Sequence, residues 1–352
     1  PASSGACSVA ARPAVERTRS HPVAVIGGGF SGLAAAYELS LRGVPCVLYE
    51  ADSSVGGLAG SFRVEGSDLE KFYHHWFKSD EHVMGLVEEL GLTDRLVSHA
   101  SRTGLYYANH HYRLASPLDV LRFDPLSWPD RVRLGLGTLR ARRVDDWKPL
   151  EHQTAADWLQ HLFGRQVYEV VWEPLLRGKF GEYADSIAAV WMWNKLKLRG
   201  GSRKADGAEE LYYLRGGFAA LAERAAERIV ELGGRVETGS PVTRIEASGG
   251  TVTAVIARSQ ARPVSAVIGT TALPLVADIV REHVEPQVCA NLEAIDYLGA
   301  VCIVLELDRS LSETYWLNVN DLSFPFVGVI EHTNMEPASA YGGRHIVYLS
   351  RY

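Results

Sequence analysis

The first stretch of the chain able to do chemistry is rich in glycine. Gly27, Gly29 and Gly32 have the spacing G-x-G-x-x-G, with Gly28 at the variable position between the first two. In this pattern the first glycine permits a tight turn, the second lets the backbone approach a pyrophosphate, and the third lets a helix pack closely on a strand. The free N–H groups at the start of such a helix attract phosphate. The spacing therefore predicts a dinucleotide-binding loop rather than an ordinary glycine-rich corner.

Two later features indicate which dinucleotide would bind. Glu50 closes the next strand-like segment, where its carboxylate can accept hydrogen bonds from a ribose diol and would repel a 2′-phosphate, which disfavours NADP. A second glycine pair, Gly56-Gly57, follows shortly afterwards. A plain NAD domain has no use for this pair, whereas in a flavoprotein it would let the backbone pass close to the diphosphate and flavin. We therefore expect FAD.

The elements that must position these residues form a β-α-β unit. Residues 21–26 and 44–49 have the continuous apolar character of strands buried on both faces, and residues 31–41 between them have helical periodicity. A parallel sheet is therefore expected. Further along, residues 215–234 predict a helix, and three strand-like pieces follow, with Ser248-Gly249-Gly250 as a hairpin turn between the last two.

The order of these patterns predicts an α/β fold: a doubly wound, Rossmann-like FAD-binding domain with an interleaved α+β substrate domain. Residues 1–20 are interpreted as a disordered leader, and residues 21–70 as the first FAD-binding segment. A mainly helical insert of the substrate domain spans 71–207, the second FAD-binding segment spans 208–285, and strands of the substrate domain span 286–352.

Composition excludes several classes of function. A formal net charge of -6 and a pI near 6.1 argue against nucleic acid as a partner. No apolar run reaches the roughly 20 residues that a transmembrane helix needs, and no metal-ligand spacing is readable. The four cysteines are scattered, which is typical of a reducing compartment. We expect a cytoplasmic protein, with peripheral membrane contact left open.

A family resemblance extends these predictions. The segment "GGGFSGLAAAYELSLRGVPCVLYEADSSVGG" resembles the amino terminus of FAD-dependent amine oxidases, protoporphyrinogen oxidases and phytoene desaturases. "YLRGGFAALAERAAERIVELGGRVETGSPVTRIE" is similar to the second FAD segment of that superfamily, and "VSAVIGTTALP" to the strand and flavin-proximal loop that follow it. "FYHHWFKSDEHV" and "VWEPLLRGKFG" resemble a bacterial branch close to protoporphyrinogen oxidase.

The resemblance and the motif together imply the cofactor-binding residues. They place Val242 on the adenine side and Thr270 in the flavin-proximal loop. The full set is Gly27, Gly29, Phe30, Ser31, Gly32, Glu50, Ala51, Gly56, Gly57, Leu58, Val242 and Thr270. Many relatives carry an arginine directly after the Gly-Gly pair. This chain has Leu58 there instead, and in this it resembles the desaturase-like and mutase-like branches. The glycine–acid motif that normally closes the FAD site in this superfamily is missing before Tyr352, so either the flavin site is incomplete or the chain is truncated, and we expect truncation.

The resemblance also suggests catalytic groups. His74 and His75 lie in a stretch that relatives bring beneath the flavin, where imidazole can donate a hydrogen bond or act as a base. The alternative is a pair of structural histidines in an aromatic patch. Predicted substrate contacts are Tyr73, Trp172, Arg177 and Lys179. The last three could instead mark a helix end with a core tryptophan.

The expected reaction removes hydride from a small hydrophobic or cyclic substrate to flavin N5. A second nucleotide-binding motif is missing, because Gly135-Leu136-Gly137 lacks a third glycine, so oxygen or a quinone is the expected acceptor. Two alternatives stay open: a non-redox flavin-dependent isomerase or sugar-nucleotide mutase, and an FAD-free fragment or binding protein on a flavoprotein scaffold. The basic stretch 195–204 could meet anionic lipid or a phosphorylated substrate, or form a solvated loop.

Overall fold

The structure is a computed structural model that describes residues 21–114, 116–201 and 209–352. The leader predicted for residues 1–20 and the end of the basic stretch 195–204 lie outside the described residues. The chain divides into two compact units. The first unit contains the described residues up to Gly60 together with Phe218–Asp296, and the second contains those in Ser61–Gly217 together with Tyr297–Tyr352. Which of these segments belong to the FAD-binding domain and which to the substrate domain stays a prediction from sequence.

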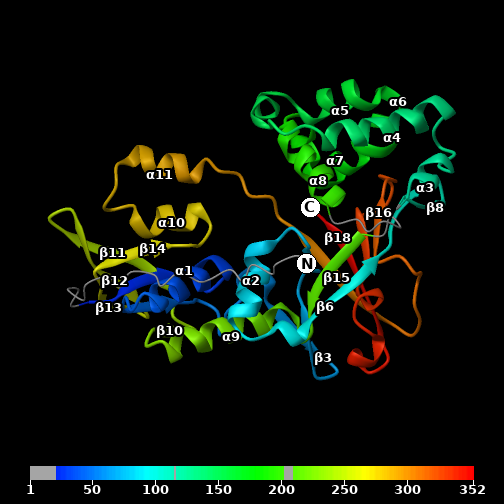
Figure 1. The fold of residues 1–352 in the computed structure, drawn as a ribbon. Helices are drawn as coiled ribbons and strands as arrows, with labels where there is room; N and C mark the ends of the chain where they lie inside the picture. Colours follow the sequence, from blue (N-terminus) through cyan, green and yellow to red (C-terminus); the bar gives the residue numbers. More distant parts are fainter. Residues whose placement is uncertain (1–20, 115, 202–208) are drawn as a thin grey trace, which may run out of the picture. The chain divides into compact units, whose positions relative to one another are not determined.

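A four-stranded parallel sheet forms the centre of the first unit (Figure 1). Its strands, in spatial order, are β10 (Arg235–Glu237), β2 (Cys46–Tyr49), β1 (Val23–Ile26) and β14 (Ala266–Gly269). Every residue of β1 and β2 is buried, because α1 (Phe30–Leu41) and neighbouring elements cover both faces. The predicted β-α-β unit and the α/β class are confirmed.

The rest of the first unit packs around this sheet. The helices are α9 (Gly217–Glu231), α10 (Leu273–Val280) and α11 (Pro286–Glu293), and a three-stranded antiparallel sheet contains β11 (Val242–Ser248), β12 (Thr251–Ala257) and β13 (Gln260–Pro263). Ser248 pairs with Thr251, so Gly249 and Gly250 form the predicted two-residue turn. Both have positive φ, 58° and 77°, as a type I′ turn requires.

The second unit contains three sheets. The largest has the order β15 (Val301–Leu307), β18 (His345–Arg351), β17 (Gly328–Glu331), β16 (Trp316–Val319), β7 (Thr103–Tyr107), β8 (His110–Arg113). The smaller sheets pair β3 (Ser61–Val64) with β4 (Ser67–Glu70), and join β5 (Trp76–Phe77), β9 (Glu209–Leu214) and β6 (Leu96–Ser101). The sequence patterns predicted strands at β15, β17 and β18 but did not reveal β3–β8, which are short or lack clear alternation.

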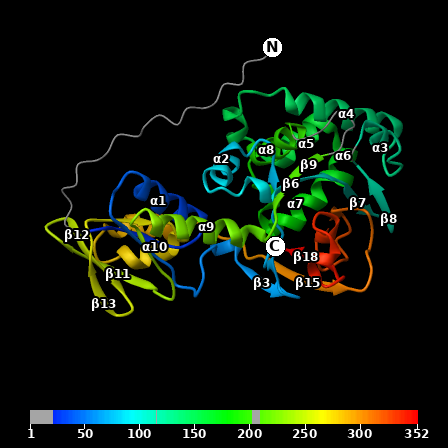
Figure 2. The ribbon, with the colours of Figure 1, turned by 60° about the horizontal axis from the view of Figure 1, so that its bottom comes forward.

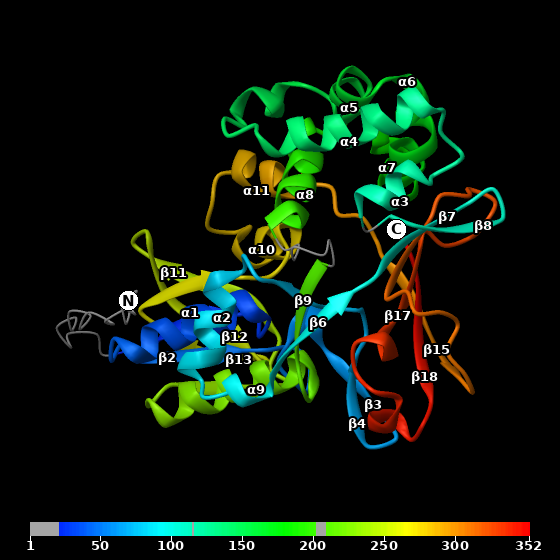
Figure 3. The ribbon, with the colours of Figure 1, turned by 45° about the vertical axis from the view of Figure 1, so that its right-hand side comes forward.

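The helices of the second unit other than α2 gather in one bundle, as Figures 2 and 3 show for α4, α5 and α6. The helices are α2 (Glu81–Glu89), α3 (Pro117–Leu121), α4 (Trp128–Arg142), α5 (Ala155–Phe163), α6 (Arg165–Val167), α7 (Glu173–Phe180) and α8 (Ala189–Gly201), with a π-helical turn at Tyr168–Trp172. A short 3₁₀ turn of the first unit is Gly57–Ala59, and those of the second unit are Thr93–Arg95, Lys148–His152, Gly181–Asp185, His332–Asn334 and Ala338–Tyr341. Within the described ranges, no helix combines the length and apolar character needed to cross a bilayer.

The π-helical turn has an identifiable cause. Pro174 has no N–H to donate to the carbonyl of Val170, four residues earlier. The buried Asn320 supplies the missing donor, because its Nδ2 lies 3.1 Å from the Val170 carbonyl oxygen and 3.0 Å from that of Val171. A side chain 150 residues away therefore stabilises this turn.

Candidate functional site

Two glycine loops meet at the carboxyl end of the parallel sheet in the first unit. The loop after β1 and the loop after β2 form an isolated parallel bridge between Gly29 and Gly56. The Gly56 N–H donates to the Gly28 carbonyl oxygen at 2.9 Å. The structure thus brings together two motifs that the sequence shows only as separate stretches, at the edge where doubly wound folds bind nucleotides.

Glycine is required at the closest approaches of this cradle. A Cβ on Gly32 would lie 1.8 Å from the carbonyl oxygen of Gly27, because α1 packs directly against the turn. Gly57 has φ +56°, and a Cβ there would lie 2.9 Å from the Cα of Gly29. A larger residue at Gly32 would push α1 away from the turn that precedes it, and one at Gly57 would push the two loops apart.

The Glu50 carboxylate is held in place by two backbone N–H groups. Its Oε2 accepts the N–H of Gly28 at 2.5 Å, and its Oε1 accepts the N–H of Asp52 at 2.8 Å. A carboxylate has about four lone-pair sites, so the predicted ribose hydroxyls could still be accepted. Sequence reasoning missed Gly28: a Cβ there would lie 2.7 Å from Glu50 Oε2, so this position is not freely variable. Only the contact with Glu50 reveals that requirement.

Thr270 and Val242 adjoin the same edge. The Thr270 hydroxyl donates to the carbonyl oxygens of Ile26 at 2.9 Å and Gly27 at 3.2 Å, which ties the end of β14 to the start of the glycine loop. Val242 opens β11 two residues after Ser240, whose N–H donates to the Glu50 carbonyl oxygen at 2.7 Å. The remaining predicted cofactor residues lie in the same loops: Phe30 is half-buried, and Ser31, Ala51 and Leu58 are exposed.

The electrostatics of this edge favour an anion. The first turn of α1 carries no acidic residue, and its N-cap is Gly29, so its N–H groups have no competing side chain. Helix α10 begins just after β14, which adds a second helix N-terminus at the same edge. Within the described residues, the hydroxyl oxygen of Thr271 is buried and has no hydrogen-bond partner. A cradle of closely spaced backbone, a helix N-terminus and a carboxylate with lone pairs to spare fits a dinucleotide.

A second cluster of predicted residues lies in the second unit. His74 Nδ1 is 2.7 Å from the Phe72 carbonyl oxygen, and burial lowers the pKa of His74. His75 Nδ1 is 3.1 Å from the Tyr315 hydroxyl, and its ring meets Trp316 edge-on with ring centroids 5.9 Å apart. Both imidazoles are therefore oriented by specific partners, an arrangement that suits either the predicted catalytic role or the structural alternative.

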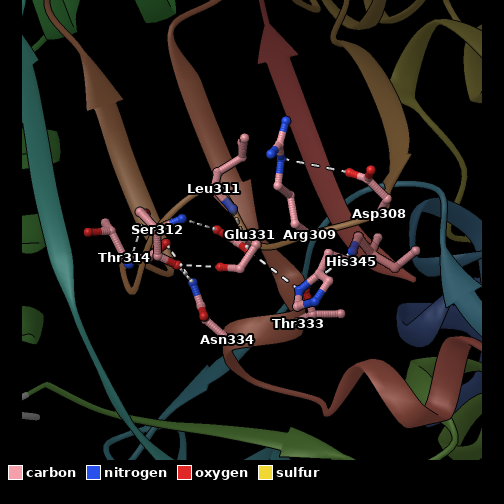
Figure 4. A network of polar contacts seen from close by, with 11 residues as sticks. Asp308, Arg309, Leu311, Ser312, Thr314, Glu331, Thr333, Asn334 and His345 are labelled. Atoms are coloured by element: carbon pink, nitrogen blue, oxygen red, sulfur yellow. Dashed lines mark hydrogen bonds and ion pairs between the residues drawn. The ribbon is translucent and has the colours of Figure 1, made fainter. Parts of the chain in front are cut away.

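A buried carboxylate fixes the loop that carries Tyr315 (Figure 4). Glu331 is 2% exposed and accepts the backbone N–H groups of Leu311 at 3.1 Å and Ser312 at 2.9 Å. Asn334 Nδ2 donates to the carbonyl oxygens of Ser312 at 2.9 Å and Thr314 at 3.0 Å. The loop, and with it the hydroxyl that meets His75, is thus positioned from β17. The sequence carries no local signal for this network.

The four predicted substrate residues do not form one cluster. Tyr73 donates to Ser350 Oγ at 3.1 Å and hydrogen-bonds with Tyr352, and Lys179 Nζ lies 3.8 Å from the centre of the Tyr352 ring. Burial raises the pKa of Tyr73. Arg177 instead forms ion pairs with Glu173 at 2.9 Å and Asp185 at 3.2 Å.

Trp172, the fourth residue, packs against Phe163 with ring centroids 5.2 Å apart. Its indole Nε1 is buried with no hydrogen-bond partner within the described residues. Of the basic stretch, Lys197 contacts Asp145 at 2.8 Å and the carbonyl oxygen of Val144 at 3.1 Å. Tyr73 and Lys179 are therefore the two predicted substrate contacts that share a neighbour.

Comparison with known proteins agrees with this geometry. The model of the family of flavin-containing amine oxidoreductases matches residues 30–340. The mitochondrial protoporphyrinogen oxidase of Nicotiana tabacum is 28% identical over 174 residues, which cover 47% of this chain and 34% of that protein. The coproporphyrinogen III oxidase of Propionibacterium freudenreichii is 29% identical over 188 residues, covering 50% of this chain and 34% of that protein.

Solved structures share the fold. An oxidoreductase from Methanosarcina mazei superposes with a TM-score of 0.74 at 17% identity, and the match covers 94% of this chain and 79% of that one. The matched stretch of this chain spans about a third of the length of each of the two curated relatives.

Proposed function

Because the chain belongs to the family of flavin-containing amine oxidoreductases, we propose that it binds FAD and acts as an oxidoreductase on a small hydrophobic or cyclic substrate. The observation that carries the proposal is the bridge between Gly29 and Gly56, which joins both glycine loops at the carboxyl end of the parallel sheet. A plain NAD domain needs only the first of these loops.

The residues of the first unit have separable roles in this proposal. The α1 N-terminus and the backbone of Gly29 and Gly57 would hold the diphosphate, and Glu50 would accept the ribose hydroxyls. When bound, the flavin supplies a two-electron acceptor for hydride. Val242 and Thr270, at the ends of their strands, would border the adenine and flavin sides of the cofactor.

The proposed substrate class is supported by the relatives. The two curated relatives described above are named as oxidases of protoporphyrinogen and coproporphyrinogen III, which are cyclic. In the aromatic cluster of Tyr73, Tyr348 and Trp316, the Tyr73 ring centroid lies 4.9 Å from that of Trp316 and 5.9 Å from that of Tyr348. Tyr348 is fully buried, so the half-buried rings of Tyr73 and Trp316 are the ones that would meet a flat molecule. Porphyrinogens are therefore the first substrates to test, with oxygen or a quinone as the acceptor.

The test begins with the colour of the purified protein. We expect a flavin absorbance spectrum after incubation with FAD, and FAD rather than FMN in the chromatogram of the released cofactor. The variant Gly57→Ala should lose the cofactor, because its Cβ would collide with the Gly29 backbone. Gly43→Ala is the matched control: Gly43 also has positive φ, +66°, but no atom lies within 4 Å of its Cβ position, so it should stay coloured.

Turnover separates the proposed chemistry from its alternatives. Anaerobic addition of a porphyrinogen should bleach the flavin absorbance, and oxygen or a quinone should restore it. A protein that stays colourless after incubation with FAD would contradict the proposal and favour a binding protein on this scaffold. A coloured protein that converts a sugar nucleotide with no net consumption of an acceptor would instead be an isomerase or mutase.

A further inference from the structure

Helix α4 has an exposed apolar stripe besides the face that it buries. The stripe consists of Trp128, Val132, Leu136 and Leu139, which are 63%, 49%, 49% and 50% exposed. At about 100° of rotation per residue, all four fall within an arc of about 80°. The buried residues lie on the other side of the helix: Asp130, Leu134, Gly137 and Ala141. The buried face accounts for the packing against α5 and α8, so the exposed stripe needs another explanation.

Arginines border the stripe on both sides. Residues 131–144 contain five arginines and no acidic residue, although the whole chain has a formal charge of -6. By the same helical rotation, Arg133 and Arg140 follow one border of the stripe, and Arg131 and Arg142 follow the other. Apolar residues flanked by long cations are typical of helices that lie in a membrane interface.

The Trp128 end of the stripe is held in place by Arg131, and the exposed apolar surface continues onto α3. The Arg131 guanidinium donates to the carbonyl oxygens of Leu121 and Leu126, both at 2.8 Å, and its carbon lies 4.9 Å from the centre of the Trp128 ring. Leu118 and Leu121 of α3 are themselves 51% and 39% exposed. The apolar stripe, these two leucines and the five arginines are called the α3–α4 surface below.

We propose that the α3–α4 surface docks on an anionic lipid bilayer. Trp128 and the leucines would enter the acyl boundary, and the guanidinium groups of Arg140 and Arg143 would reach the phosphates, each cation near an anionic surface adding to the attraction. Arg131, held by two backbone carbonyls, and Arg133, paired with Asp130 at 2.8 Å, would add positive charge at the border of the stripe without leaving these partners. A second copy of this chain is a poorer occupant, because a two-fold contact would face the five arginines with their own copies. Since the remainder of the chain is more acidic than the whole, the same lipid charge would also orient the protein.

The test measures sedimentation of the full chain with two kinds of vesicle. We expect binding to vesicles of phosphatidylcholine mixed with phosphatidylglycerol, weak binding to phosphatidylcholine alone, and release by added salt. The double variant Leu136→Ser/Leu139→Ser should lower the partition coefficient about tenfold or more. Arg140→Gln/Arg143→Gln should do the same on anionic vesicles only.

The matched control changes residues of the same types and exposure elsewhere in the second unit. Leu322 is 63% exposed and the Arg309 side chain 87% exposed, so Leu322→Ser/Arg309→Gln should bind vesicles as the parent protein does. Quenching of tryptophan emission by brominated lipid should be lost in Trp128→Phe. Equal sedimentation of all variants, no sedimentation of the parent, or a dimer that the leucine variant dissociates would each overturn the proposal.

Discussion

Replacing Glu50 by glutamine tests how the cradle of the two glycine loops is held together. In the parent chain each carboxylate oxygen accepts one backbone N–H, from Gly28 at 2.5 Å and from Asp52 at 2.8 Å. A glutamine side chain offers one oxygen and one NH₂ group, so one of the two backbone donors must face another donor. A hydrogen bond to a charged group contributes about 1.5–3 kcal/mol, and because Glu50 is half-exposed we expect a loss of about 2 kcal/mol.

Hydrogen exchange measures this loss locally. Since about 1.4 kcal/mol corresponds to a factor of ten, the Gly28 amide should exchange about thirtyfold faster in Glu50→Gln than in the parent protein. Mass spectrometry of peptides covering residues 27–33 and 50–57 gives the rates. All eight tryptophans belong to the second unit, so tryptophan emission reports separately whether that unit is disturbed.

The control and the refuting result are specific. Glu38→Gln alters an exposed ion pair with Arg42 on α1 and should leave exchange at Gly28 unchanged. Unchanged exchange in Glu50→Gln would refute the inference that the carboxylate holds the loop. Faster exchange throughout the chain, with altered tryptophan emission, would show a global rather than a local effect and would refute it as well.

Three further predictions concern the second unit. Asn320→Ala should lower the free energy of unfolding of this unit by about 2–4 kcal/mol in urea titrations followed by tryptophan emission, because two buried carbonyls lose their donor; Asn194→Ala, at an exposed position of α8 in the same unit, should not lower it. Burial lowers the pKa of His332 to about 4 from its ordinary 6.5. The neutral imidazole therefore contributes stability that is fully present above pH 6.5, and the free energy of unfolding falls by about 3 kcal/mol as the pH drops toward 4. Melting experiments at a series of pH values should show this fall for the parent protein and a smaller fall for His332→Gln. Thr154→Ala should cost about 1 kcal/mol in the same urea titrations, because its hydroxyl caps α5 by accepting the Asp157 N–H at 3.1 Å; a loss below the error of the titration would contradict this.

Local features of this chain were predictable from sequence. The turn at Gly249-Gly250 and the cap at Thr154 involve residues at most a few positions apart, so their geometry is set by the residues themselves. The β-α-β unit followed from apolar runs whose length and flanking glycines distinguish strand from helix. Each of the two glycine loops was predictable by itself for the same reason.

Short strands in the second unit were not predictable. The segments β3 to β8 contain polar residues or lack alternation, as in β8 with its two histidines, and they become strands because neighbours pair with them. The π-helical turn depends on Pro174 locally but on Asn320 for its donor. Sequence patterns carry no information about a donor so far along the chain.

The sequence by itself determined that Gly27, Gly29 and Gly32 form a glycine loop between a strand and a helix and that a glycine pair follows Glu50. Tertiary structure decided what these residues touch. It paired Gly29 with Gly56 and directed the Glu50 carboxylate to the backbone of the loop. It also left one apolar stripe of α4 exposed while burying the other face. The physical reason is common to all three: spacing along a chain sets local backbone geometry, whereas contact and exposure depend on segments that only folding brings together.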